Sequence, residues 1–275
     1  MTWIEYLTLL LALAFGFGAM GWLVRRYDLK RPNFRGERIP AVAGLAFLLG
    51  GEFFYAFQWF LQGLNTSLAS VYFLVTVGFG GLGLLDDLAG DSSSKGFRGH
   101  FAALQSGRLT TGAAKAIGGG LLSLVAGFLL TAPCPLWFAL LAALLIALSA
   151  NTLNLLDLRP GRCLFGFFVG TATIFAVLVS QHAAESGLFL WAAFAFALIL
   201  YPLDALGSVM LGDTGANALG AVLGVAGVIY LAPVWQCVLV LALLGLQVWS
   251  ERHSLSKLIE DTPWLRALDR KIGVR

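Results

Sequence analysis

Charged residues are scarce in this sequence: only 12% of its 275 residues are Asp, Glu, Lys or Arg, whereas 59% are hydrophobic. Soluble globular domains contain about 25% charged and about 45–50% apolar residues. With a mean hydropathy of +0.83, the chain lacks the polar surface that a domain in water needs. The composition excludes a soluble enzyme and predicts an all-α, polytopic integral membrane protein.

Cysteine is scarce as well, with three residues in the chain. Cys134, Cys163 and Cys237 show no paired spacing and no CxxC motif. Neither a disulfide framework nor a zinc site is therefore expected. With no set of Cys and His ligands, a metal site in this chain has to be built from carboxylates.

Long apolar runs are abundant. About 20 apolar residues cross a bilayer as a helix, and we predict about nine to ten transmembrane helices in one domain, residues 1–275. The nine clearest spans cover residues 3–24, 41–62, 68–85, 112–132, 136–155, 163–180, 187–203, 214–231 and 234–250. In the tail that follows, 251–275, apolar residues recur at helical spacing with a break at Pro263, which predicts an amphipathic helix on the membrane surface.

The positive charges predict the orientation of these spans. All 18 Lys and Arg residues lie in four stretches: 25–40, 86–115, 156–162 and 251–275. The loops on the opposite side contain none. By the positive-inside rule the basic stretches are cytoplasmic, so the N-terminus is expected outside the plasma membrane and the C-terminus in the cytoplasm. A cleaved signal peptide is not expected, since no positive charge precedes the first apolar run.

Four aspartates follow the same pattern as the positive charges. Asp86 and Asp87 close an apolar run, Asp157 follows another, and Asp213 precedes a third. Ionised carboxylates are costly in hydrocarbon, so these side chains should lie at the water boundary. All four fall on the predicted cytoplasmic face, which predicts one shared site there. Glu52 lies midway along a span, and a structural hydrogen bond or a protonated acid is favoured over a catalytic role.

Several other polar residues lie near this predicted site. Asn151, Asn154 and Asp157 are spaced by three and share one helix face. Lys115 stands at the start of a predicted helix, where a helix N-terminus already favours anions. The positive charges of Lys115 and of the Arg-rich loop 31–40 have two equally good explanations: contact with an anion, or a signal for membrane orientation. For Asp213 taken alone, a helix cap is the favoured one.

Carboxylates surrounded by Lys and Arg suit a hard cation. Mg²⁺, with Mn²⁺ as an alternative, prefers carboxylate oxygens together with substrate phosphates. Such a combination indicates phosphoryl transfer, and its place at a membrane boundary indicates a lipid substrate. A transporter is a competing reading, but transport sites lie near the bilayer midplane, and these acids do not.

Four motifs support a resemblance to a known family. The chain resembles the polyprenyl-phosphate N-acetylhexosamine-1-phosphate transferases over residues 31–270 or so. The motifs are Asn33-Phe-Arg-Gly-Glu-Arg-Ile-Pro40, Gly83-Leu-Leu-Asp86-Asp87, Asn151-Thr-Leu-Asn154-Leu-Leu-Asp157 and Gly212-Asp213-Thr-Gly. The resemblance implies a Mg²⁺-dependent enzyme that moves a sugar 1-phosphate from a UDP-sugar to polyprenyl phosphate and releases UMP. N-acetylglucosamine 1-phosphate is the expected group, transferred in the first step of a lipid-linked cell-wall or surface glycan.

The resemblance also implies roles for individual residues. Asp213 and Asp87 are expected to bind the metal, and Asp86 acts with them on the lipid phosphate. Six further residues are expected to bind substrate: Lys115, Asn33, Asn154, Asp157, Arg252 and His253. The expected partners are polyprenyl phosphate, a nucleotide sugar and the membrane; no nucleic acid is expected, and a homodimer is left open.

The sequence departs from the family pattern in three places. The family usually has Asp-Gly-x-Asp-Gly where this chain has Asp157-Leu-Arg-Pro-Gly161, so Pro160 replaces the second acid. Ser208 stands where a Lys is often found, and a segment with several His is reduced to Arg252-His253. These departures argue against the muropeptide branch. They keep open a member that uses another nucleotide sugar, or one that binds polyprenyl phosphate without catalysis.

Overall fold

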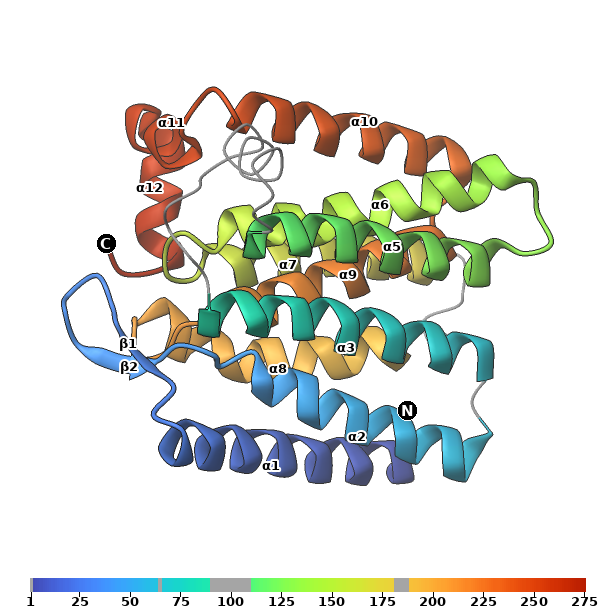
Figure 1. Cartoon of the computed structure of the whole chain (residues 1–275), viewed down its shortest axis with the longest axis horizontal. Helices are drawn as coiled ribbons and strands as arrows, with labels where there is room; N and C mark the ends of the chain where they lie inside the picture. Colours follow the sequence, from blue (N-terminus) through green and yellow to red (C-terminus); the bar gives the residue numbers. More distant parts are fainter. Residues whose placement is uncertain (1, 64–65, 90–109, 181–187) are drawn as a thin grey trace.

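The computed structural model describes residues 2–63, 66–89, 110–180 and 188–275, and it is 81% helix and 2% strand. Within the described residues, nine helices run back and forth between two ends of the molecule (Figure 1). They are α1 (Trp3–Arg26), α2 (Leu45–Gln62), α3 (Thr66–Ala89), α5 (Thr111–Thr131), α6 (Leu136–Leu156), α7 (Arg162–Ser180), α8 (Leu188–Ala205), α9 (Gly212–Tyr230) and α10 (Pro233–Ser250).

Seven of these helices are long and apolar enough to cross a membrane. The apolar stretches of the other two, Leu45–Leu61 in α2 and Phe189–Ala205 in α8, are shorter. The all-helical, polytopic membrane architecture is thereby confirmed, while the number of spans and their orientation stay predictions. Each predicted span coincides with one helix. The largest differences are at the start of α2, expected at 41, and at the end of α3, expected at 85.

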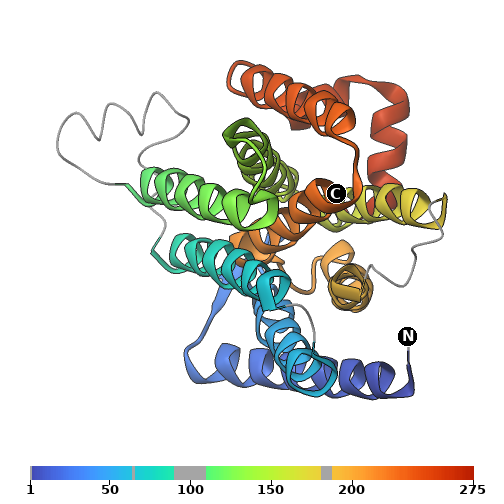
Figure 2. The ribbon, with the colours of Figure 1, turned by 90° about the vertical axis from the view of Figure 1, so that its right-hand side faces the viewer.

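Helix α9 lies at the centre of the bundle, with the other helices around it (Figure 2). In the apolar stretch of α9, 72% is buried inside the bundle, against 17% in that of α10. Glycines allow this packing: a Cβ added at Gly220 would lie 2.6 Å from Ala150 Cα, and one at Gly224 would lie 2.6 Å from Ile146 Cα. Small residues let helix backbones approach closely in a membrane, so α6 and α9 are in direct contact.

A short hairpin departs from the all-helical prediction. Strand β1 (Lys30–Pro32) pairs antiparallel with β2 (Arg38–Pro40) within the loop that follows α1. The chain after β2 then pairs with the segment before α9, since Met210 N donates to Pro40 O (2.8 Å) and Gly44 N donates to Leu211 O (2.9 Å). The hairpin was missed because three-residue strands carry too little alternation to be read from sequence.

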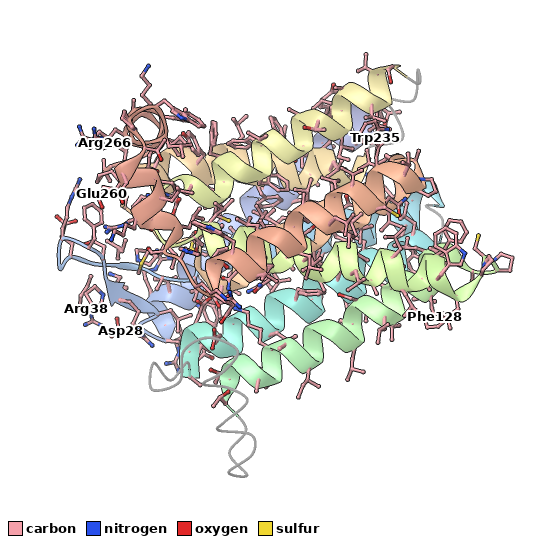
Figure 3. All side chains as sticks on the ribbon, turned by 90° about the horizontal axis from the view of Figure 1, so that it is seen from above. Asp28, Arg38, Phe128, Trp235, Glu260 and Arg266 are labelled. Atoms are coloured by element: carbon pink, nitrogen blue, oxygen red, sulfur yellow. The ribbon has the colours of Figure 1, made fainter. Side chains whose placement is uncertain are left out.

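The C-terminal tail forms two short helices at the same end of the bundle as the hairpin. They are α11 (Leu255–Asp261) and α12 (Pro263–Ile272), and the break between them falls at Pro263, where it was expected. Figure 3 shows Glu260 and Arg266 of this tail at the end that also carries Asp28 and Arg38. Phe128 and Trp235 lie at the opposite end. The basic stretch 86–115 is described only in part, since Lys95, Arg98 and Arg108 lie outside the described residues.

Candidate functional site

Four predicted site residues from four different helices meet at the end of the bundle that carries the hairpin and the C-terminal tail. Lys115 of α5 forms an ion pair with Asp213 of α9, and its Nζ lies 3.6 Å from Asp86 Oδ2 of α3. Asn154 of α6, in the amide orientation that suits both neighbours, donates to Asp213 Oδ1 (2.8 Å) and accepts from Lys115 Nζ (3.0 Å). The side chains of Lys115, Asp86 and Asp213 are 17%, 26% and 27% exposed. A ligand can therefore reach this group, which we call the Lys115 cluster.

Asp87, the neighbour of Asp86 in sequence, caps helix α9. Its Oδ1 accepts from Asp213 N (2.9 Å), and its Oδ2 accepts from Thr214 N (2.9 Å) and Thr214 Oγ1 (2.6 Å). A helix N-terminus leaves backbone N–H groups unsatisfied, and no side chain of α9 itself caps this one. The predicted metal ligand Asp87 thus already has three hydrogen-bond donors, and it holds the backbone of Asp213 in place.

Two glycines allow α3 and α9 to meet at this point. A Cβ at Gly83 would overlap the carbonyl group of Asp213. Gly212 has φ +75°, in the left-handed region, and a Cβ there would lie 2.7 Å from Asp87 Oδ2. Only glycine avoids both the clash and the backbone strain. Gly83 therefore serves helix packing.

Asp157 ends helix α6 and contacts the same turn before α9. Its carboxylate accepts a hydrogen bond from the backbone N–H of Gly212. Burial raises the pKa of the Asp157 carboxyl well above its ordinary value, and the negative charges of Asp204 and Asp213 raise it further. Asn151, three residues before Asn154, faces α10 instead and donates to Gln247 Oε1 (2.7 Å).

Asp204 lies near these residues, although the sequence analysis did not predict it as a site residue. It ends helix α8 and is only 4% exposed. Its Oδ2 accepts from the backbone N–H of Gly161 (2.7 Å), and it also accepts from the backbone N–H of Leu211. A carboxylate just after the predicted span 187–203 was a usable signal, because the other four acids occupy the same kind of position.

The C-terminal tail is clamped to the loop that follows Asp157. Asp269 of α12 accepts from Arg162 Nε (2.6 Å) and from Arg275 Nε (2.5 Å). Arg275 Nη1 also donates to Pro160 O (2.9 Å). Burial alone would raise the pKa of Asp269, but the hydrogen bonds from Arg162 and Arg275 outweigh burial and hold it well below its usual range. Pro160 thus serves here as a backbone anchor.

A cavity of about 550 Å³ opens beside the Lys115 cluster. Its wall is apolar where α3, α5 and α6 face it, through Phe79, Leu82, Ala116, Gly119, Ala147 and Leu148. Its polar wall includes Asp86, Lys115, Asn151, Asn154, Asn217 and Gln247. Phe79 lies two turns from Asp86, about 10 Å along the helix axis. The cavity therefore extends from the charged side chains of Asp86 and Lys115 to an apolar region around Phe79.

Four predicted substrate-binding residues do not line this cavity: Asp157, described above, and Asn33, Arg252 and His253. Arg252 and His253 line a separate, open groove on α10, where the His253 ring stacks on Trp249 with 5.1 Å between ring centroids. Asn33 organises the hairpin: its Oδ1 accepts from Arg35 N and Glu37 N, both at 2.9 Å. Substrate binding by Asn33, Arg252 and His253 stays a prediction, and this cavity does not involve them.

Asp86 and Asp213 are the carboxylates of the site that could hold a metal ion. Among the described residues, no three His, Cys, Asp or Glu side chains are arranged to hold a metal. Mg²⁺ does not require three, because it keeps water and substrate phosphate oxygens among its ligands and uses one or two carboxylates. Asp86 and Asp213 both approach Lys115 Nζ, so their oxygens lie close together around a point of positive charge.

No protein-family model and no curated protein sequence matches the chain.

Proposed function

We propose that the protein transfers a sugar 1-phosphate, with N-acetylglucosamine 1-phosphate as the first candidate, from a UDP-sugar to polyprenyl phosphate and releases UMP. The observation that carries this proposal is the convergence of Asp86, Lys115, Asn154 and Asp213 beside a cavity with an apolar wall. Three of the four motifs of the family resemblance contribute to this group, and they come from separate helices.

The charge of the site supports a cation and a phosphate as its joint ligands. Asp157 lies close enough to Asp87, Asp204 and Asp213 for their negative charges to act on its carboxyl group. Asp86 faces Lys115. Five carboxylates thus gather at one end of the bundle, and one ammonium group faces two of them. A phosphate would be repelled from such a site unless a divalent cation accompanied it.

Asp86 and Asp213 would hold Mg²⁺, which when bound supplies the positive charge that screens two phosphate groups from each other. A lipid phosphate is largely ionised near neutral pH, so the protein has more to do in positioning and charge stabilisation than in proton removal. Lys115 provides a second positive charge next to the same carboxylates. Asn154 orients both Asp213 and Lys115 through its amide.

The cavity supports a lipid acceptor. A prenyl chain needs an apolar surface at membrane depth, and its phosphate needs cations at the water boundary. The cavity offers Phe79, Leu82 and Leu148 on its apolar wall, and Lys115 at its charged end. Together with the basic loops, this arrangement supports a cytoplasmic active site in the plasma membrane.

The test is UMP release by the purified protein in detergent with Mg²⁺, undecaprenyl phosphate and a panel of UDP-sugars. Release that requires both the lipid and Mg²⁺ is the expected result, and the best donor names the sugar. Asp28→Asn is the matched control for active-site variants, because Asp28 lies in an exposed pair with Arg38 at the same end. Lipid binding without release from any UDP-sugar would contradict the proposal and favour another nucleotide donor or a non-catalytic role.

A further inference from the structure

Asp204 lies where a carboxylate does not help its own helix. It is in the last turn of α8, and a helix C-terminus carries partial negative charge that disfavours an acid. The side chain is also buried, and a buried carboxylate is costly unless hydrogen bonds satisfy it. The interactions that offset these costs must therefore come from outside α8.

Two loops supply the hydrogen bonds that Asp204 accepts. Gly161, at 2.7 Å, belongs to the loop that begins at Asp157. Leu211 immediately precedes Gly212 and Asp213 at the start of α9. One side chain thus joins the segment that carries Asp157 to the segment that carries Asp213.

Both loops have backbone geometry that makes them sensitive to this link. Gly161 and Gly212 have φ values of +81° and +75°, so each loop turns through the left-handed region where few residues can follow. The peptide N–H groups beside these turns are fixed by a charged acceptor, and hydrogen bonds to charged groups are stronger than neutral ones. Loss of the acceptor removes a hydrogen bond from both turns at once.

We propose that Asp204 is a positioning residue that holds the loop 157–161 and the start of α9 in a fixed relative position, so that Asp213 stays directed to Lys115 and Asn154. Asp204 does not line the cavity beside the Lys115 cluster, so it acts through the two loops. The effect on turnover rests on the proposed function, whereas the effect on the relative position of the loops does not.

The relative position of the two loops is measured first. The measurement is the distance between nitroxide spin labels on cysteines placed at Arg159 and Ser208. Both positions are exposed. Cys134 and Cys237 are exposed and are replaced by Ser, while the buried Cys163 stays. The parent chain is expected to give one narrow distance distribution. Asp204→Ala should broaden or shift it, and Asp204→Asn, which keeps one acceptor oxygen, should have a smaller effect. Asp28→Asn should leave it unchanged.

Turnover is measured on the same variants without labels. A misplacement of about 1 Å can cost roughly a hundredfold in rate, so kcat should fall about tenfold in Asp204→Asn and about a hundredfold in Asp204→Ala. KM for the UDP-sugar should change by less than about threefold, because the residues in the cavity are intact. A merely structural loss would lower the active fraction without this graded loss of kcat per folded molecule.

The outcomes separate the two proposals. An unchanged distance distribution in Asp204→Ala would overturn the positioning role. A changed distribution with normal kcat would also overturn it, since the relative position of the loops would not matter for the reaction. If the parent chain itself releases no UMP, the proposed function fails, and the spin-label result still decides whether Asp204 sets the relative position of the loops.

Discussion

Asp87 Oδ1 accepts a hydrogen bond from the backbone N–H of Asp213 at 2.9 Å. Both residues were predicted to bind the metal, but the carboxylate of Asp87 instead holds the backbone from which the Asp213 side chain projects. The side chain of Asp213 is thereby directed to Lys115 and Asn154. The two aspartates should therefore respond differently to substitution.

Asp213→Asn should abolish turnover and leave the fold intact. The variant removes a charge that faces Lys115 but keeps an oxygen that can accept from Lys115 or Asn154. Removing one electrostatic contact to a transition state typically costs about 10²–10³ in kcat. UMP release and a thermal melt of the same preparation would be compared with those of Asp28→Asn. Near-normal turnover would rule out the metal-ligand role.

Asp87→Ala should lower stability as well as turnover. The substitution leaves the N–H groups of Asp213 and Thr214 without an acceptor, and loss of an N-cap costs about 0.5–2 kcal/mol. Asp86→Ala is the comparison, because Asp86 faces the partly open Lys115 cluster and caps no helix. Thermal unfolding in detergent should show a clear drop for Asp87→Ala alone. Equal melting temperatures would contradict the capping role.

Asp157→Asn should raise thermal stability at neutral pH while it reduces turnover. The folded protein raises the pKa of Asp157, so the ionised carboxylate destabilises the fold at any pH above its ordinary pKa of about 3.9. The gain should be present at pH 7 and vanish below about pH 4, where both states bind the proton. Melting curves at the two pH values check this. A less stable variant at pH 7 would refute it.

Asp269→Asn should release the C-terminal tail at neutral pH. Asp269 has a lowered pKa, so its contribution to stability is complete above its ordinary pKa of about 3.9 and declines from there until the pH has fallen through the lowered pKa. The variant leaves the buried Arg162 without its counter-ion, a change that costs about 3–5 kcal/mol when one partner of a buried pair is removed.

The mobility of a nitroxide at Ala267, an exposed position of α12, reports on this release. The label should be immobile in the parent chain at pH 7 and mobile in Asp269→Asn at every pH. In the parent chain it should stay immobile at about pH 4 and become mobile only well below that pH, because the lowered pKa keeps Asp269 ionised there. Equal mobility in the two proteins at pH 7 would show that the clamp does not hold the tail.

A tag placed after Arg275 should be accessible only from the cytoplasm. The tail lies at the same end of the bundle as the Arg-containing hairpin, and the positive-inside rule assigns that end to the cytoplasm. Labelling of the tag before and after permeabilisation of cells would measure its location. External labelling in intact cells would reverse the orientation and place the candidate site outside.

The sequence alone determined the class of the protein and the course of its chain. Each helix in a bilayer must satisfy its own backbone hydrogen bonds, so a run of apolar residues predicts a span without knowledge of its neighbours. The charges on aspartates at span ends likewise predict a water boundary, whichever residues lie next to them. That reasoning brought Asp86, Asp157 and Asp213 to one end, and Asp204 satisfied the same criterion.

Only the tertiary structure decided what each carboxylate does there. Asp86 and Asp87 are neighbours in sequence, but successive residues on a helix point about 100° apart, so one faces Lys115 and the other caps α9. The distinction depends on a glycine contact between α3 and α9 and on a turn at Gly212. Contacts between residues more than a hundred positions apart, such as Asp87 with Thr214, arise from packing, and no local pattern encodes them.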